Sequence, residues 1–405
     1  MISSDLIKKL ALKYSDTVLS YRRYFHANPE LSFKEINTSV FLKKILSNLN
    51  IEYKDGFAGT GIVAEIKGKN PLHKKIALRA DMDALPIHEQ SDKPYKSLND
   101  GVMHACGHDV HMACLLGALL ILNDCKNNFE GSVQFVFQPG EEVLPGGAKL
   151  MLEEKAFGDK LPDMIIAQHV LPGMETGKVG FKSGMYMAST DEIYLEVFGK
   201  GGHAAMPSEY TNPILIASKI LLELQHEFMS KKHMDESGNE IPCVLAFGKI
   251  QGNGATNIIP ESVKIEGTFR TMNEIWRSKS HETIKFICEK IAQENSGKIG
   301  LSIIKGYPFL VNHEEVTNTC RSAAQEYLGI EQVVELPLRM TAEDFAWYSQ
   351  KIPACFYRLG TGNKTLGITC GVHTSTFDID ENSLLIGSGL MAWNALSLLK
   401  NNFHS

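Results

Sequence analysis

Residues 103–123 read MHACGHDVHMACLLGALLILN, which joins a cluster of reactive side chains to a long apolar run. The pattern predicts a helix from about Gly107 to Asn123. Its apolar part, Met112–Leu122, is shorter than the roughly 20 residues that a membrane-spanning helix needs. Asp109 and His111 at its start favour a helix buried inside a protein. This stretch therefore predicts a core helix whose beginning carries the chemistry.

The regions on either side of this helix predict an α/β domain. The first 45 or so residues have helical spacing of apolar positions, interrupted at Asn28-Pro29. Short apolar runs follow that we predict as strands: Gly61–Ile66, Lys75–Ala80, Ser132–Phe137 and Asp163–Ala167. Strands that alternate with helices indicate a sheet with its ligand site at the strand ends. Polar side chains stand at those ends: Asp81, Asp83, Glu141, Glu142 and His169.

The middle of the chain has a different pattern. Its predicted elements, in order, are strand Asp191–Phe198, helix Asn212–Met229, strands Pro242–Lys249 and Ser262–Arg270, helix Asn273–Gln293 and strand Ile299–Lys305. This β-α-β-β-α-β order is that of a ferredoxin-like sheet. The α/β pattern resumes after Pro308. We therefore expect a discontinuous catalytic domain, 1–186 and 307–405, interrupted by an inserted domain, 187–306.

Composition excludes several classes of protein. The chain has 405 residues, is 43% hydrophobic and carries a net charge of −6, so it is not a disordered chain and has no basic excess for nucleic acid. Its eight cysteines are scattered and form no Cys-x-x-Cys pair, which favours reduced thiols over a disulfide scaffold. No export signal stands in Met1–Lys13. We expect a cytoplasmic protein that does not bind membranes.

The cluster Met103–His111 holds three histidines, a cysteine and an aspartate in nine residues. Cys106 and His108 can reach one point from an extended turn, and thiolate and imidazole are ligands of zinc and neighbouring metals. A polar loop that caps the helix is the alternative. His104 and His111 are equally consistent with ligation and with support of the ligands. A nucleophilic Cys106 with His108 as its base is less consistent with so short a spacing.

The second cluster is Gln138-Pro139-Gly140-Glu141-Glu142, directly after a predicted strand. Adjacent carboxylates repel one another unless a cation separates them. One can then bind metal while the other takes a proton from water. A solvated acidic turn is the alternative. His169 and His373 are weak signals by themselves and gain weight only from the shared sheet edge.

The inserted domain contributes two glycine-rich loops. Gly199–Ala205 presents His203, which can donate to a developing oxyanion, and residues 252–257 present Asn257 as an amide donor. Simple turns explain both loops equally well. The lysine and hydroxyl residue of a phosphate-binding loop and the GxSxG elbow of a serine hydrolase are both missing from the sequence.

Taken together, the motifs resemble the aminoacylase/carboxypeptidase family of metal-dependent amidohydrolases, which includes hippurate hydrolases, indoleacetyl-amino-acid hydrolases and N-acetyldiaminopimelate deacetylases. The matching motifs run nearly from end to end: Arg22-Arg23 with His26, Pro29–Ser32, Arg79–Pro86, His104–Asp109, Gln138–Glu142, His169, Gly201–Pro207, Asn257–Pro260, Gly267–Arg270, Glu343–Phe345, and His373 with Phe377-Asp378. Mild departures are Gly140 for a common alanine, and Ser208, Asn212, Val372 and Thr374 near the lid and His373.

The resemblance implies a zinc-peptidase-like catalytic domain with an inserted ferredoxin-like lid that pairs two subunits. It implies metal ligands at Cys106, His108, Glu142, His169 and His373, with Asp81 and Asp109 beside them. Five ligands are suited to two divalent ions. Zinc is the expected metal, and manganese, cobalt or nickel are the alternatives.

The implied reaction is hydrolysis of small N-acyl amino acids such as N-benzoyl-glycine. Glu141 would be the general base, and His203 would reach a neighbouring subunit's site. Asn257 and Arg270 are candidates for the substrate carboxylate, although Arg270 suits a strand salt bridge equally well. A carboxypeptidase or dipeptidase, and a non-catalytic metal-binding homologue, are the alternatives.

Overall fold

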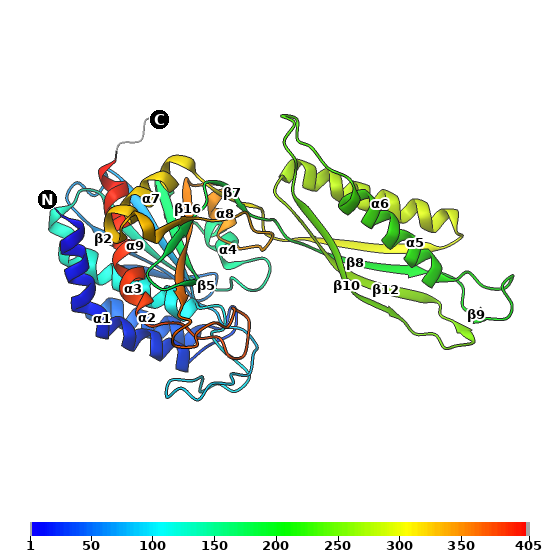
Figure 1. The fold of residues 1–405 in the computed structure, drawn as a ribbon, viewed down its shortest axis with the longest axis horizontal. Helices are drawn as coiled ribbons and strands as arrows, with labels where there is room; N and C mark the ends of the chain where they lie inside the picture. Colours follow the sequence, from blue (N-terminus) through cyan, green and yellow to red (C-terminus); the bar gives the residue numbers. More distant parts are fainter. Residues whose placement is uncertain (1, 402–405) are drawn as a thin grey trace. The chain divides into compact units, whose positions relative to one another are not determined.

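The computed structural model describes residues 2–401, and the chain divides into two compact units (Figure 1). The first comprises the described parts of Met1–Tyr186, Val311–Pro337 and Asp344–Ser405. The second comprises Met187–Leu310 together with Leu338–Glu343. No helix within residues 2–401 is long and apolar enough to cross a membrane.

The first unit is built on an eight-stranded sheet of order β1-β2-β4-β3-β5-β16-β6-β15. Its strands are β1 Glu52–Phe57, β2 Gly61–Lys67, β3 Lys75–Asp81, β4 Ser132–Gln138, β5 Met164–Glu175, β6 Val179–Phe181, β15 Val333–Glu335 and β16 Ala354–Gly362. The strands β4, β3, β5 and β16 run parallel to one another. Central parallel strands are buried on both faces, which explains why β4 and β16 are buried along their whole length.

Helices pack on this sheet. They are α1 Ser4–Ala27, α2 Ile36–Asn48, α3 His108–Cys125, α4 Gly147–Glu153, α7 Glu314–Leu328, α8 Ala346–Ser349 and α9 Ser383–Lys400. Helices α1, α3 and α9 pack together, and α3 and α9 contact β3. The predicted helix at residues 107–123 is therefore correct, and α3 is buried on nearly every side. Short helical turns lie at Lys126–Asn128 and Ile330–Gln332.

The second unit is a four-stranded antiparallel sheet of order β10-β12-β8-β13. Its strands and helices are β8 Asp191–Phe198, α5 Pro213–Gln225, a helical turn His226–Ser230, β10 Cys243–Gly252, β12 Ser262–Thr271, α6 Glu274–Glu294 and β13 Lys298–Lys305. A two-stranded ribbon pairs β9 Gly202–His203 with β11 Ile258–Ile259. A further two-stranded ribbon, β7 Gly184–Met187 with β14 Leu310–Asn312, lies where the chain passes between the two units.

This strand order is ferredoxin-like, with α5 and α6 following the first and third strands of the sheet. Both helices cover one face of it, and the core between them contains Ile193, Ile216, Phe269 and Ile284. The predicted fold class, an α/β catalytic unit with an inserted ferredoxin-like α+β unit, is confirmed.

Candidate metal centre

The candidate site lies in the first unit, where the parallel strands β3, β4 and β5 bring polar residues to one region. Asp81 ends β3, and Glu141 and Glu142 follow β4. His169 lies within β5 rather than after it, because the strand continues to Glu175 through its pairing with β16. The sequence-based strand end at Ala167 was therefore too early.

Gly107 sets the entry to helix α3. It is left-handed, with φ of 84°, and an added Cβ would lie 2.5 Å from a methyl carbon of Val170. Only glycine fits this conformation and this close approach. The loop therefore passes directly over β5, where Cys106 Sγ lies 3.5 Å from Nε2 of His169.

Five side chains form two groups that share one sulfur atom. Cys106, His108 and His169 make the first group, and Cys106, Glu142 and His373 make the second, with the potential ligand atoms of each group within 4.8 Å of one another. His373 Nε2 lies 3.2 Å from Cys106 Sγ and 3.3 Å from Glu142 Oε1. These are the five residues that the family resemblance implied as ligands, and the structure brings them together.

The histidine rings are oriented by their Nδ1 atoms. Nδ1 of His108 lies 2.8 Å from the backbone oxygen of Asp83, and Nδ1 of His169 lies 2.8 Å from that of Val170. A carbonyl oxygen only accepts, so each Nδ1 donates to it and each Nε2 is the ring atom that faces the cluster. Nε2 of His108 is buried and has no hydrogen-bond partner among residues 2–401. The donor set is thus arranged to accept a cation.

The charges of the cluster lead to the same conclusion. Hydrogen bonds to Cys106 and Glu142 raise the pKa of His373 to about 10. Burial, with the charge of Glu142, raises the pKa of the Cys106 thiol. Both shifts mean that positive charge is strongly favoured between Cys106, Glu142 and His373. A divalent cation would supply that charge and would also favour loss of the thiol proton.

Glu141 stands beside the cluster. It is 7% exposed, and its carboxylate lies within 4.8 Å of ligand atoms of His108 and Glu142. Its Oε1 accepts a hydrogen bond of 3.4 Å from the backbone N–H of Asp344. Asp344 is itself held by Arg79 Nη2 at 2.7 Å and by the Gln138 amide at 2.8 Å. A carboxylate held next to the ligands is suited to moving a proton there.

Asp81 supports the site without belonging to either of the two groups that share Cys106. It is fully buried and lies 2.6 Å from Arg79 Nη1 and 2.6 Å from His111 Nδ1. Burial opposes its charge, but His108 and Arg79 outweigh that effect and hold its pKa well below the ordinary value. His111 Nε2 accepts from Val170 N at 3.0 Å, so both ring nitrogens of His111 are occupied. Although Asp81, His108 and His111 also converge, His111 is better placed to orient than to ligate.

Asp109 and His104 belong to none of the groups of potential metal ligands found among residues 2–401. Asp109 pairs with Arg22 Nε at 2.9 Å and with His26 Nδ1 at 2.8 Å, all three side chains being buried. Neither ring nitrogen of His104 has a hydrogen-bond partner within residues 2–401, and burial lowers its pKa to about 4. His104 is therefore a neutral core residue.

Asp83 is a supporting residue whose role the sequence did not reveal. Its Oδ2 accepts from Ser32 Oγ at 2.7 Å and from Glu142 N at 2.9 Å, while its backbone oxygen accepts from His108. Asp83 thereby ties a ligand from α3 to a ligand from the turn after β4. Its position two residues after Asp81, beyond the same strand, was the available signal.

The remaining candidates belong to the second unit. His203 on β9 pairs in register with Ile258 on β11, next to Asn257, whose backbone oxygen accepts from Ala204 N at 3.0 Å. Arg270 stands near the opposite end of β12, where Nη1 donates to Met340 O at 3.3 Å. Eight residues of strand, about 26 Å, separate that position from the β9 end of the sheet. Within one chain, His203 and Asn257 are neighbours and Arg270 is not.

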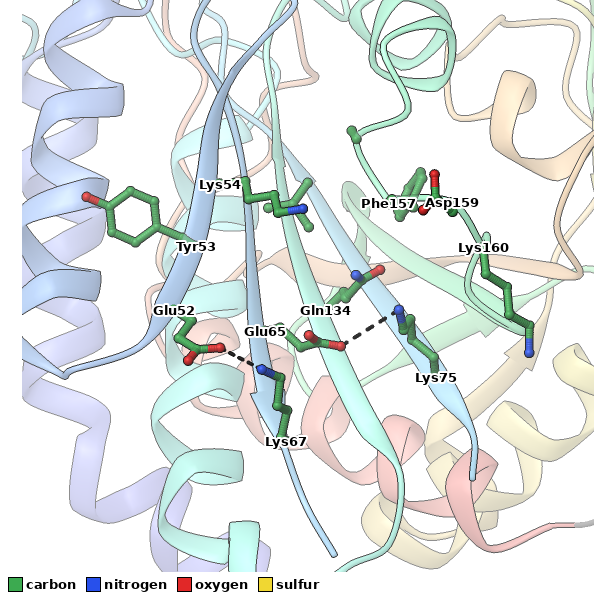
Figure 2. A pocket seen from close by; sticks show the side chains of 13 residues that line it. Glu52, Tyr53, Lys54, Glu65, Lys67, Lys75, Gln134, Phe157, Asp159 and Lys160 are labelled. Carbon is green, nitrogen blue, oxygen red and sulfur yellow. Dashed lines mark hydrogen bonds and ion pairs between the residues drawn. The ribbon is translucent and has the colours of Figure 1, made fainter. Parts of the chain in front are cut away.

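A separate pocket of about 520 Å³ lies on the strands β1, β2, β4 and β3 of the first unit (Figure 2). Its lysines are largely compensated by acidic neighbours, with Lys67 2.6 Å from Glu52 and Lys75 3.9 Å from Glu65. None of the five clustered residues lines it. This pocket is distinct from the candidate metal centre.

A ferredoxin-like unit is inserted into a unit with a mixed sheet that carries a Cys/His/Glu cluster, and this combination defines a hydrolase of the amidohydrolase and metallopeptidase type. Residues 77–393 match the family described as Peptidase family M20/M25/M40, and the chain belongs to this family. The resemblance seen in the sequence is thereby confirmed.

Named relatives cover nearly the whole chain. An N-acetyl-L-cysteine deacetylase of Bacillus subtilis is 35% identical over 388 residues, covering 96% of this chain and 89% of its own length. Thermostable carboxypeptidase 2 of Saccharolobus solfataricus is 35% identical over 390 residues, covering 95% and 96%. Among solved structures, the YXEP protein of Bacillus subtilis, described as a dinuclear metal binding peptidase from the M20 family, superposes with a TM-score of 0.81 at 32% identity, covering 96% and 99%.

Proposed function

We propose that this protein is a metal-dependent amidohydrolase that cleaves the amide bond of small N-acyl amino acids, with Glu141 as general base. The observation that carries the proposal is the pair of ligand groups sharing Cys106, with the Glu141 carboxylate beside them. A binding protein without catalysis would need the five ligands but would have no use for Glu141 at that place.

Two divalent ions would be held by Cys106, His108, Glu142, His169 and His373. The relative described as a dinuclear metal binding peptidase supports this number. Mixed sulfur, nitrogen and oxygen donors favour zinc, with manganese, cobalt or nickel as alternatives. When bound, the ions would supply a water of lowered pKa and a Lewis acid for the acyl oxygen.

Glu141 then performs both proton transfers. Its carboxylate accepts the proton that the attacking water loses, and the same carboxyl group delivers that proton to the departing nitrogen. Its Oε1 accepts a hydrogen bond from Asp344 N, which helps to hold the carboxylate next to the ligands. Asp81 and Asp83 fix the rings and the turn around it, so that little reorganisation accompanies the reaction.

The second unit would act as a lid and as a dimerisation domain. His203 would donate to the developing oxyanion, and Asn257 and Arg270 would bind the substrate carboxylate. Because Arg270 is about 26 Å of strand away from the β9 end, one small substrate would take His203 and Asn257 from one chain and Arg270 from another. This separation supports a homodimer. Strand β10 lies at the edge of its sheet and is largely exposed, as a pairing surface requires.

A metallo-carboxypeptidase or dipeptidase is the second candidate, because the carboxypeptidase relative is as similar as the deacetylase. The same metals and the same base would serve either amide. The two candidates differ in the acyl side of the amide that is cleaved. It is a simple acyl group without an amine in the first case and an amino acid or peptide in the second.

The deciding experiment measures metal content and turnover on one preparation. The purified protein, loaded separately with zinc, manganese, cobalt and nickel, is assayed with N-acetyl and N-benzoyl amino acids and with matched dipeptides. We expect about two ions per chain and higher kcat/KM for the N-acyl series. Faster cleavage of dipeptides would favour the peptidase. Two bound ions without cleavage of any substrate would support the non-catalytic alternative.

A further inference from the structure

The feature that the proposed reaction leaves unexplained is the carboxylate of Glu35. Its side chain is fully buried in the first unit, at the residue before α2. A carboxylate at that position commonly caps its helix, but this one makes no such bond. Burying a carboxylate is costly unless its oxygens are used. Glu35 must therefore serve something other than its own helix.

Its hydrogen bonds lead to the turn that carries Glu141. Oε1 accepts from the backbone N–H of Phe33 at 3.0 Å and from that of Gly140 at 2.9 Å. Oε2 accepts from Thr60 Oγ1 at 2.9 Å. One carboxylate thus joins the loop before α2, the start of β2 and the residue directly before Glu141.

Gly140 is shaped for this contact. It has φ of 62°, and an added Cβ would lie 2.3 Å from Cζ of Phe33, so the Phe33 ring lies against the bare glycine. The carbonyl of Gly140 accepts from Gly147 N at 3.0 Å. Both backbone polar groups of Gly140 are therefore fixed from outside the turn.

A second carboxylate fixes the other side of the turn. Asp83 Oδ2 accepts from Glu142 N, and Ser32 Oγ donates to the same oxygen. The residues on both sides of Glu141 are thus anchored by buried carboxylates that the segment Ser32–Glu35 supplies or supports. Glu141 lies between the two anchors.

We propose that Glu35 is a positioning residue, which sets the Glu141 carboxylate against the metal cluster by holding the N–H of Gly140. This inference rests on the proposed role of Glu141. Displacing a catalytic group by about 1 Å can cost 100-fold in rate, so loss of this anchor should lower kcat with little effect on substrate affinity.

The test compares four variants of the full-length, metal-loaded protein. Glu35→Ala removes the anchor, and Glu35→Asp keeps a carboxyl group that is too short to reach Gly140. Glu35→Gln keeps one oxygen that can accept from the N–H groups of both Phe33 and Gly140, as Glu35 Oε1 does. Glu30→Ala is the matched control, because the Glu30 carboxylate accepts from the N–H groups of Asn37 and Thr38 and so holds only the start of α2. If Glu35→Ala does not fold, Glu35→Asp takes its place.

For Glu35→Ala and Glu35→Asp we expect kcat to fall about 10- to 100-fold, with KM and metal content nearly unchanged. Glu35→Gln should stay within about threefold of wild type, and so should Glu30→Ala. A normal kcat in both anchor-removing variants, or an equal fall in Glu30→Ala, would overturn the proposal.

Hydrogen exchange separates this inference from the proposed function. The amide protons of Gly140, Glu141 and Glu142 should exchange at least about tenfold faster in Glu35→Ala than in wild type, and at the wild-type rate in Glu30→Ala and Glu35→Gln. Unchanged exchange in Glu35→Ala would show that Glu35 does not hold the turn, whether or not the protein cleaves an amide. Accelerated exchange in a protein without activity would refute only the proposed function.

Discussion

Replacing Glu35 by glutamine should change how the stability of the protein depends on pH. Burial, with the nearby charge of Asp83, raises the pKa of Glu35 from its ordinary 4.5 to about 7. Between these values the folded protein keeps a proton that the unfolded chain releases, so stability falls as pH rises. The stabilising effect of the protonated carboxyl is complete below about pH 4.5 and lost above about pH 7. The whole change corresponds to about 3 kcal/mol in the free energy of unfolding.

Glutamine has no such proton to lose. The free energy of unfolding of Glu35→Gln, relative to that of wild type, should therefore rise by about 3 kcal/mol from pH 4.5 to pH 8. Urea unfolding at both values measures it, with metal chelated from both proteins. Fluorescence reports the first unit alone when Trp276 is replaced by phenylalanine, since Trp347 and Trp393 both belong to that unit.

A second variant checks the cause of this pH dependence. Thr60→Val removes a hydrogen bond that lowers the pKa of Glu35, so it should steepen the pH dependence. The reasoning would be refuted if wild type and Glu35→Gln differed in free energy of unfolding by the same amount, within about 1 kcal/mol, at the two pH values. That result would mean that Glu35 does not titrate between them.

The remaining predictions concern the metal centre and its supports. Glu141→Gln should lower kcat by about 1,000-fold with metal content unchanged by elemental analysis, and near-normal turnover would contradict its role as base. Cys106→Ala should bind fewer ions, more weakly, in a metal titration; unchanged stoichiometry and affinity would remove Cys106 from the ligands. Arg22→Met leaves buried Asp109 without its cation and should cost about 3–5 kcal/mol in urea unfolding, whereas a loss under about 1 kcal/mol would mean that His26 alone satisfies it. Mixing His203→Ala chains with Glu141→Gln chains should restore partial activity if His203 acts across a dimer, and no recovery would place it in its own subunit or outside the reaction.

Local pattern was sufficient for much of the fold. The strict alternation of Asp191–Phe198 matches β8 from end to end, because one face of that strand is wet. Strand β5 was cut short in the prediction, since His169, Pro172 and Gly173 weaken its local signal while pairing with β16 carries it to Glu175. The edge strand β1, Glu52–Phe57, has no apolar run and was not predicted.

The site divides in the same way. The resemblance pointed to the five clustered residues because their types are rare together, and the structure brings them within reach of one another. Glu35 and Asp83 gave no comparable signal. Their partners are backbone N–H groups about 105 and 59 residues away, which no spacing along the chain encodes. A carboxylate that accepts hydrogen bonds from backbone N–H groups of a distant turn can be recognised only from the three-dimensional structure of that turn.

The place of β16, between β5 and β6, matters during synthesis. β5 is complete at Glu175, but the strand that covers its free edge ends at Gly362. At about 5–20 residues per second, a ribosome needs roughly 10–40 s to make the intervening chain. During that interval the second unit can fold, while the apolar stretch Met164–Ala167 keeps one unpaired edge. The insertion therefore lengthens the period in which a nascent chain is prone to aggregation, and yield in a cell depends on what shields that edge until the last strand arrives.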